Sequence, residues 1–190
     1  MPEDVNRPPV FTIGYGARDI DAFIAALKAH DVAYLIDVRS KPYSRYKPDF
    51  AKKALAGHLQ THGIRYVFMG DMLGGQPDDP DCYAADGRVN YDKVRQKPFY
   101  QEGIGRLRQA WQQQLRVALM CSEGKPEQCH RSHLIGKTLT NEGIDVAHID
   151  ENDQLITQQD VILRQTKGQP GLPGLDVHRT TSRKRYEHDP

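Results

Sequence analysis

Residues 10–15 have the sequence VFTIGY, a short run of β-branched and aromatic residues that reaches a glycine at position 14. A continuous apolar run of this length is typical of a strand buried on both faces, as in a parallel sheet. An amphipathic stretch follows at 19–30, with Asp19 as its predicted N-cap and apolar residues at helical spacing. These residues therefore predict a buried strand followed by a covering helix.

The same alternation continues along the chain. Further strands are predicted at 33–38, 64–69, 116–121 and 146–149, and further helices at 49–63, 99–114, 129–141 and 157–163. This order specifies an α/β fold, a single domain at 10–166 with a mainly parallel central sheet flanked by helices. Ligands bind beyond the carboxyl ends of such strands. The residues that follow the strands are therefore expected to line one edge of the sheet, which we call the rim.

Three segments lack this pattern. Residues 1–9 are predicted to be a flexible N-terminus. Residues 70–98 contain prolines and little periodicity, which predicts a long loop. Residues 167–190 have almost no large apolar side chains, which predicts a disordered tail.

Composition limits the partners and the setting. The 190 residues carry 26 Lys and Arg against 25 Asp and Glu, a net charge of +1, so any attraction to nucleic acid must come from a local patch. Three cysteines argue against a disulfide framework and favour a reducing compartment. No apolar run is long enough to cross a membrane, and the N-terminus does not resemble a signal peptide. We expect a cytoplasmic protein with no membrane partner, and nothing in the sequence names a cofactor or an oligomeric state.

The segment 121–131, CSEGKPEQCHR, joins a predicted strand to a predicted helix at the rim. If the helix starts near Cys129, the free amides of its first turn favour an anion, and Lys125 and Arg131 add positive charge. The same field lowers the pKa of a thiol, which makes Cys129 a candidate thiolate.

Several interpretations of this segment compete. A Cys-x5-Arg phosphate loop is excluded, because Glu127 stands where its arginine would be. A metal site at Cys121, Cys129 and His133 remains open, although the Cys-x7-Cys spacing matches no common motif. A buried structural thiol at Cys121 also remains open.

The remaining interpretation is an anion or nucleoside pocket. In it, Glu123, His130 and Arg131 would handle protons and charge. Unlike the phosphate loop and the metal site, this pocket does not require an unusual spacing of its residues along the chain.

A second segment, 37–47, has the sequence DVRSKPYSRYK. Asp37 ends a hydrophobic strand, where a carboxylate is costly unless it is paired or used. The loop that follows interleaves four basic residues with Tyr43 and Tyr46, and such groups track phosphates and stack on bases. The alternative is a solvated loop in which Asp37 pairs with Arg39.

The ordered motifs resemble those of a prokaryotic family known as domain of unknown function 488. The motifs are Thr12-Ile13-Gly14-Tyr15, Asp37-Val38-Arg39-Ser40 with Pro42 and Ser44, Pro48 and Phe50, Gly63-Ile64 with Tyr66, Leu73-Gly74-Gly75, Cys121-x-Glu123 with Cys129-His130-Arg131, and His148-Ile149. They run from about residue 11 to 150, and Ser122 stands where the family usually has alanine. The resemblance implies a compact α/β domain whose polar motif residues converge on one pocket, and it implies no particular reaction.

These observations favour an enzyme acting on a phosphate-bearing nucleoside or nucleic acid. The candidate catalytic residues are Asp37, Cys121, Glu123, Cys129, His130 and Arg131, with Cys121 or Cys129 as nucleophile. The candidate substrate-binding and anion-binding residues are Gly14, Tyr15, Arg39, Ser40, Lys41, Ser44, Gly74, Gly75 and Lys125. One alternative is a nucleic-acid-binding module without catalysis, and another is a metal-binding or redox protein that uses Cys121, Cys129 and His133.

Overall fold

A computed structural model describes residues 7–169 and 177–186. Its main sheet has six strands in the order β3-β2-β5-β1-β6-β7, all parallel except β7, which runs antiparallel to β6. The six strands are β1 (Val10–Gly14), β2 (Tyr34–Asp37), β3 (Arg65–Phe68), β5 (Val117–Cys121), β6 (Val146–Ile149) and β7 (Leu155–Thr157). The predicted α/β fold with a mainly parallel sheet is confirmed.

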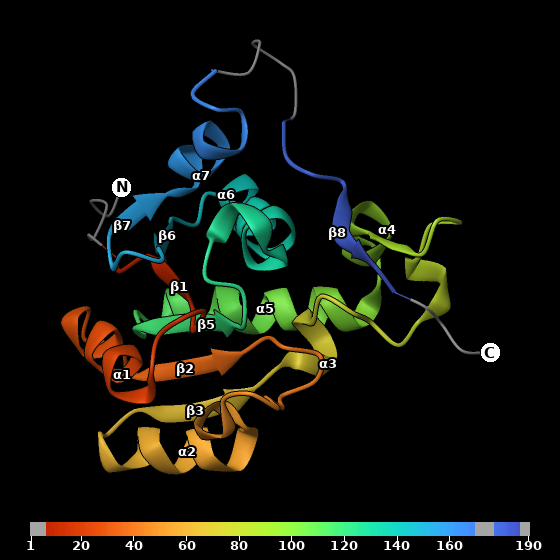
Figure 1. Cartoon of the computed structure of the whole chain (residues 1–190). Helices are drawn as coiled ribbons and strands as arrows, with labels where there is room; N and C mark the ends of the chain where they lie inside the picture. The colour runs from red at the N-terminus through yellow and green to blue at the C-terminus, as the bar shows by residue number, and fades with distance from the viewer. Residues whose placement is uncertain (1–6, 170–176, 187–190) are drawn as a thin grey trace.

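Helices cover both faces of this sheet (Figure 1). Helices α1 (Ile20–Ala29) and α2 (Lys52–Thr61) pack on one face, where Phe23, Leu27 and Leu55 are fully buried. Helices α5 (Pro98–Gln112) and α6 (Lys137–Asn141) pack on the other. The remaining helices are α3 (Gly70–Leu73), α4 (Tyr91–Arg95) and α7 (Gln158–Gln165).

The topology opens a crevice at the carboxyl ends of β1 and β5, which are neighbours in the sheet. The chain leaves β1 toward α1 on one face, and it leaves β5 toward α6 on the other. Adjacent strands whose connections diverge in this way leave space between their ends for a ligand. Gly14 pairs with Cys121, and Asp37 lies beside Met120, so the predicted rim forms at this edge.

The prediction of one long loop at 70–98 is wrong. The segment contains α3, a short strand β4 (Arg88–Asn90) and α4, and it buries Leu73, Cys82, Val89, Tyr91 and Val94 in the core. Elements of three to five residues are too short to show a periodicity, which is why the pattern missed them.

The prediction of a disordered tail at 167–190 is also wrong for part of that range. Strand β8 (Thr181–Arg185) pairs antiparallel with β4 to form a second, two-stranded sheet. An edge strand of this kind needs backbone hydrogen bonds rather than large apolar side chains, so composition does not reveal it. Residues 170–176 and 187–190 of the predicted tail lie outside the described residues.

The predicted helix at 129–141 begins later than expected. A short 3-10 turn at Pro126–Gln128 is followed by a π-helical turn at Arg131–Gly136, which continues into α6.

At the N-terminus, the guanidinium carbon of Arg7 lies 4.8 Å from the centre of the Trp111 ring. Residues 1–6 of the segment that was predicted to be flexible lie outside the described residues. None of the helices within 7–169 and 177–186 combines the length and the apolar character needed to cross a membrane.

The docking of β8 can be tested at Ser182, whose side chain is buried. Its hydroxyl accepts a hydrogen bond from the Val89 amide (3.0 Å) and donates to the Lys184 carbonyl (2.6 Å). Because a buried donor that loses its partner costs about 1–3 kcal/mol, we expect Ser182→Ala to speed hydrogen exchange of the Val89 amide by about 10-fold. Lys184→Ala keeps the backbone carbonyl and should leave Val89 protected. Free exchange of Val89 in the wild-type protein would contradict the description of β8.

Candidate functional site

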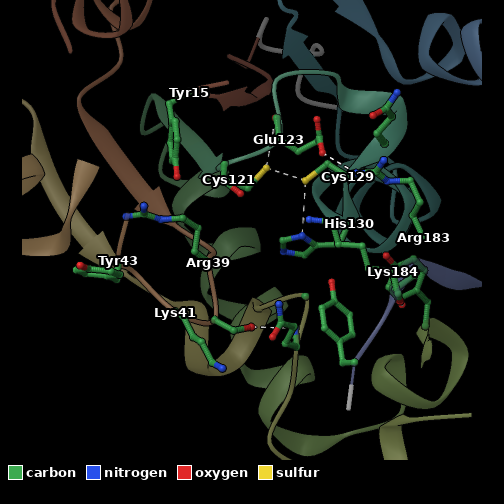
Figure 2. A pocket seen from close by; sticks show the side chains of 18 residues that line it. Tyr15, Arg39, Lys41, Tyr43, Cys121, Glu123, Cys129, His130, Arg183 and Lys184 are labelled. Atoms are coloured by element: carbon green, nitrogen blue, oxygen red, sulfur yellow. Dashed lines mark hydrogen bonds and ion pairs between the residues drawn. The ribbon is translucent and has the colours of Figure 1, made fainter. Parts of the chain in front are cut away.

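A cavity of about 200 Å³ lies at the carboxyl ends of β1, β2 and β5. Six segments line it: Tyr15 after β1, residues 39–43 after β2, Gly75 and Gln76 after α3, Tyr91 at the start of α4, residues 121–130 at and after β5, and β8 with Tyr186. Figure 2 shows Arg39, Lys41 and Tyr43 on one side of the two sulfur atoms, and Arg183 and Lys184 on the other. Segments far apart in sequence therefore build a single site.

Two cysteine side chains lie in contact in this cavity. Cys121 ends β5 and Cys129 follows the turn at Pro126–Gln128, and their Sγ atoms are 2.7 Å apart. Both residues are free thiols and are almost completely buried. The structure therefore brings together two thiols that are separated by seven intervening residues in the chain.

Arg131 lies directly behind the thiols and is fully buried. Its Nη1 donates to Cys121 Sγ at 2.9 Å, its Nε donates to Thr12 Oγ1 at 3.1 Å, and its Nη2 donates to the Gly124 carbonyl at 3.1 Å. No carboxylate among the described residues pairs with it. A buried charge is costly unless an opposite charge balances it, and the nearest group that can become an anion is the thiol pair.

The two thiols differ in their ionisation. Burial raises the pKa of Cys121 well above its usual value, and the hydrogen bond with Cys129 raises it further. Burial alone would also raise the pKa of Cys129, but the hydrogen bond from Cys121 and the charge of Arg131 outweigh burial and lower it to about 6. At neutral pH the pair therefore holds one proton on Cys121 and a thiolate on Cys129.

His130 is oriented to accept a proton from Cys129. Its Nε2 lies 3.2 Å from the Val38 carbonyl and 3.1 Å from the Leu73 carbonyl, so Nε2 must carry the ring proton. Its Nδ1 therefore has a free lone pair, and it lies 3.6 Å from Cys129 Sγ. Burial lowers the pKa of His130, which keeps the ring neutral and able to act as a base.

Gly75 provides the space for this ring. A Cβ at position 75 would lie 2.9 Å from His130 Nδ1, closer than real Cβ contacts allow. Gly74 has a similar role, because a Cβ there would lie 2.2 Å from Ser40 Oγ. These glycines allow close packing around the site.

Asp37 is buried and fully paired. Its carboxylate accepts two hydrogen bonds from the Arg39 guanidinium, at 2.9 Å and 2.7 Å, one from the Arg39 amide at 3.1 Å and one from the Tyr66 hydroxyl at 2.6 Å. Burial and the bond to Asp37 raise the pKa of Tyr66, which stays a neutral donor. The ion pair between Asp37 and Arg39 is thus present, and it holds Arg39 at the cavity wall.

The structure brings most of the predicted site residues together. Those that line the cavity are Tyr15, Arg39, Ser40, Lys41, Gly75, Cys121, Glu123, Cys129 and His130. Those that do not line it are Gly14, Asp37, Ser44, Gly74, Lys125 and Arg131. Of this second group, Asp37 accepts a hydrogen bond from Arg39, and Arg131 donates one to Cys121, so both contact lining residues. Ser44 Oγ accepts a hydrogen bond from the Lys47 amide at 3.2 Å. Lys125 is exposed.

One wall of the cavity was not predicted from the sequence. Ser182, Arg183, Lys184 and Tyr186 line it from the segment that was predicted to be disordered, and Arg183 pairs with Glu123 at 2.9 Å. The run of basic residues at 183–185 was the one available signal. Gln76, Tyr91, Ser122 and Gln128 complete the missed lining residues.

The proposed ligand set for a metal does not form. The His133 ring nitrogen Nε2 lies 2.8 Å from the Glu127 carbonyl, and His133 does not line the cavity. Across residues 7–169 and 177–186, no group of three or more His, Cys, Asp or Glu side chains is arranged to hold a metal ion. Cys121 and Cys129 remain as a pair without His133.

Comparison with known families gives one match. The sequence model described as domain of unknown function DUF488 matches residues 19–137, more than half of the chain. The chain belongs to the DUF488 family. No curated protein and no solved structure matches the chain.

The DUF488 match includes the loop after β2 and the whole segment from Cys121 to Arg131. Tyr15 and the wall formed by β8 lie outside the matched residues. In this DUF488 protein, the thiols and Arg131 therefore belong to the family domain, whereas part of the cationic lining comes from the C-terminal segment.

The contact between His130 and Cys129 can be tested through Gly75. We expect Gly75→Ala to displace the imidazole and to slow alkylation of Cys129 by iodoacetamide several-fold below pH 6, where Cys129 carries a proton, because the thiol loses its base. Gly57→Ala is the matched control, since nothing lies within 4 Å of a Cβ at that position. Equal alkylation rates in the two variants would contradict the assigned role of His130.

Proposed function

We propose that this protein is an enzyme in which the Cys129 thiolate attacks a phosphate-bearing nucleoside, either free or as one unit of a single-stranded nucleic acid. The observation that carries this proposal is the position of Cys129 Sγ in a cationic cavity, in contact with a second thiol and beside a buried guanidinium. A thiolate in such a setting is a strong nucleophile.

The cavity is suited to an anion. Arg39, Lys41, Arg183 and Lys184 line it, and Glu123 is its one acidic lining residue. Arg39 is 6% exposed, and its Nη1 is buried with no hydrogen-bond partner in the described part of the chain. Buried donors are rarely left unpaired, so an unpartnered guanidinium nitrogen at a cavity wall favours an anionic ligand such as a phosphate.

The cavity is also suited to a flat aromatic group. Tyr15, Tyr43, Tyr91 and Tyr186 line it. Aromatic faces stack on nucleobases whatever the base, and the cationic groups beside them track phosphate. The volume of about 200 Å³ is below the usual range for drug-sized ligands, which favours one nucleoside unit over a folded or double-stranded partner.

The reaction begins at the Cys129 sulfur. The Cys129 thiolate forms a bond to an electrophilic atom of the substrate, and the displaced group leaves with its bonding electron pair and takes a proton from solvent. Neutral His130 then accepts a proton at Nδ1 from an attacking water. The hydroxyl of that water bonds to the substrate atom, the bond from this atom to sulfur breaks, and Cys129 leaves as the thiolate.

The basic loop extends this surface beyond the cavity. Tyr43 is 70% exposed and Tyr46 is 90% exposed, with Arg45 exposed between them. Exposed tyrosines between cations form a platform for further nucleotides. This loop is the observation that favours a single-stranded nucleic acid over a free nucleotide.

A turnover and binding panel of nucleoside monophosphates and short single-stranded oligonucleotides tests the proposal. We expect Cys129→Ser to abolish turnover and His130→Gln to reduce it by about 10²–10⁴-fold, because the variant lacks the base. Cys82→Ser is the matched control, since Cys82 is buried outside the cavity, and it should retain full turnover.

The same panel separates the two substrate forms. Stacking contributes about 1–3 kcal/mol per base, so Tyr46→Ala should weaken oligonucleotide binding by about 5–100-fold and leave nucleoside monophosphate binding unchanged. Lys41→Gln should weaken both ligands, whereas Lys28→Gln, an exposed change on α1, should weaken neither. Salt-dependent binding without turnover of any panel member would contradict the enzyme and indicate a nucleic-acid-binding module.

A further inference from the structure

We propose that Cys121 and Cys129 form a reversible intramolecular disulfide, with a peroxide as the oxidant and a small thiol as the reductant. The proposal concerns the two thiols themselves, and only its effect on turnover rests on the proposed function. Oxidation would convert the nucleophile into a disulfide and would switch the enzyme off until a thiol reduces it.

The geometry brings the two sulfurs close to bonding distance. They are 2.7 Å apart, and a disulfide bond is about 2.05 Å long. Cys121 is held by the β5 ladder, with the Tyr15 amide donating to its carbonyl at 3.1 Å. Cys129 is held by the turn before it, with its amide donating to the Pro126 carbonyl at 3.1 Å. The pairing therefore requires a small approach of the side chains and no rearrangement of the strand or the turn.

The surroundings assign a different role to each thiol. Cys129 faces His130 Nδ1 and lines the cavity, so it can lose its proton and meet a small oxidant. Cys121 receives a hydrogen bond from Arg131, and its own S–H donates to the Cys129 sulfur, so it keeps its proton. Cys129 is therefore the thiol that is oxidised first, and Cys121 is the thiol that resolves it.

Oxidation by hydrogen peroxide takes two steps. The Cys129 thiolate attacks one oxygen of hydrogen peroxide, the O–O bond breaks, and the products are a sulfenic acid and hydroxide. The Cys121 sulfur then attacks the sulfenic sulfur, the S–O bond breaks, and the hydroxyl leaves as water with the Cys121 proton. Overall, the thiolate and the thiol give up two electrons and one proton, and the peroxide becomes one water and one hydroxide, which takes a proton from solvent to give the second water.

Arg131 makes the reverse reaction favourable. In the disulfide the buried guanidinium has lost its thiolate and retains only neutral partners, Thr12 and the backbone carbonyls. A disulfide whose reduced form is stabilised in this way is readily reduced. An incoming thiolate attacks the Cys121 sulfur, the S–S bond breaks, and Cys129 leaves as the thiolate beside Arg131. A second reductant thiol then releases Cys121 as a thiol and leaves the reductant as its own disulfide.

The test is mass spectrometry of the intact, fully reduced protein after treatment with a stoichiometric amount of hydrogen peroxide. We expect a loss of two hydrogen masses, a peptide that links Cys121 to Cys129, and full recovery of the starting mass with reduced glutathione. Cys82→Ser is the control and should behave as the wild type does, because Cys82 is not part of the pair. In Cys121→Ser, Cys129 should instead accumulate as sulfenic and sulfinic acids, because no resolving thiol remains.

Three outcomes would overturn the proposal: oxygen addition to Cys129 in the wild type, a disulfide between two molecules, or no change of mass. Each is read from mass alone, without a substrate. A disulfide that forms as expected in a protein that turns over no nucleotide would leave this proposal standing and would contradict the proposed function.

Discussion

The buried guanidinium of Arg131 is the constraint around which the site is arranged. It lies behind the ends of β1 and β5, where it donates to Thr12 on one strand and to Cys121 on the other. Thr12 Oγ1 is also 2.7 Å from His148 Nδ1, but burial lowers the pKa of His148 to about 3, so this histidine is neutral. Because no carboxylate in the described part of the chain pairs with Arg131, the charge that balances it has to come from the thiols. The reactivity of Cys129 follows from this imbalance.

The cavity combines parts with different origins. The thiols, His130 and the cationic loop after β2 lie within the family domain, on elements whose positions the parallel sheet determines. The opposite wall belongs to β8, which is held by its pairing with β4 and by the ion pair of Arg183 with Glu123. In this arrangement a strand outside the matched residues adds positive charge and a tyrosine next to the thiols.

The main fold could be predicted because buried parallel strands are continuous apolar runs that alternate with amphipathic helices. Strands β4 and β7, with three residues each, and β8, with one buried side chain, carry no such pattern, so they were missed. The site was predictable in part, since Cys121, Glu123, Cys129 and His130 follow a strand end, where ligands bind. The contact between the two sulfurs was not predictable, because it depends on the turn between them rather than on a known spacing.

The most direct test of this account is the ionisation of the two thiols in the reduced protein. Labelling the cysteine Cβ carbons and following their NMR chemical shifts against pH gives one titration for each residue. We expect a midpoint of about 6 for Cys129, while Cys121 remains protonated through neutral pH. A Cys129 that stays protonated up to its ordinary pKa of 9.0 would show that Arg131 is not balanced by a thiolate, and it would contradict the account.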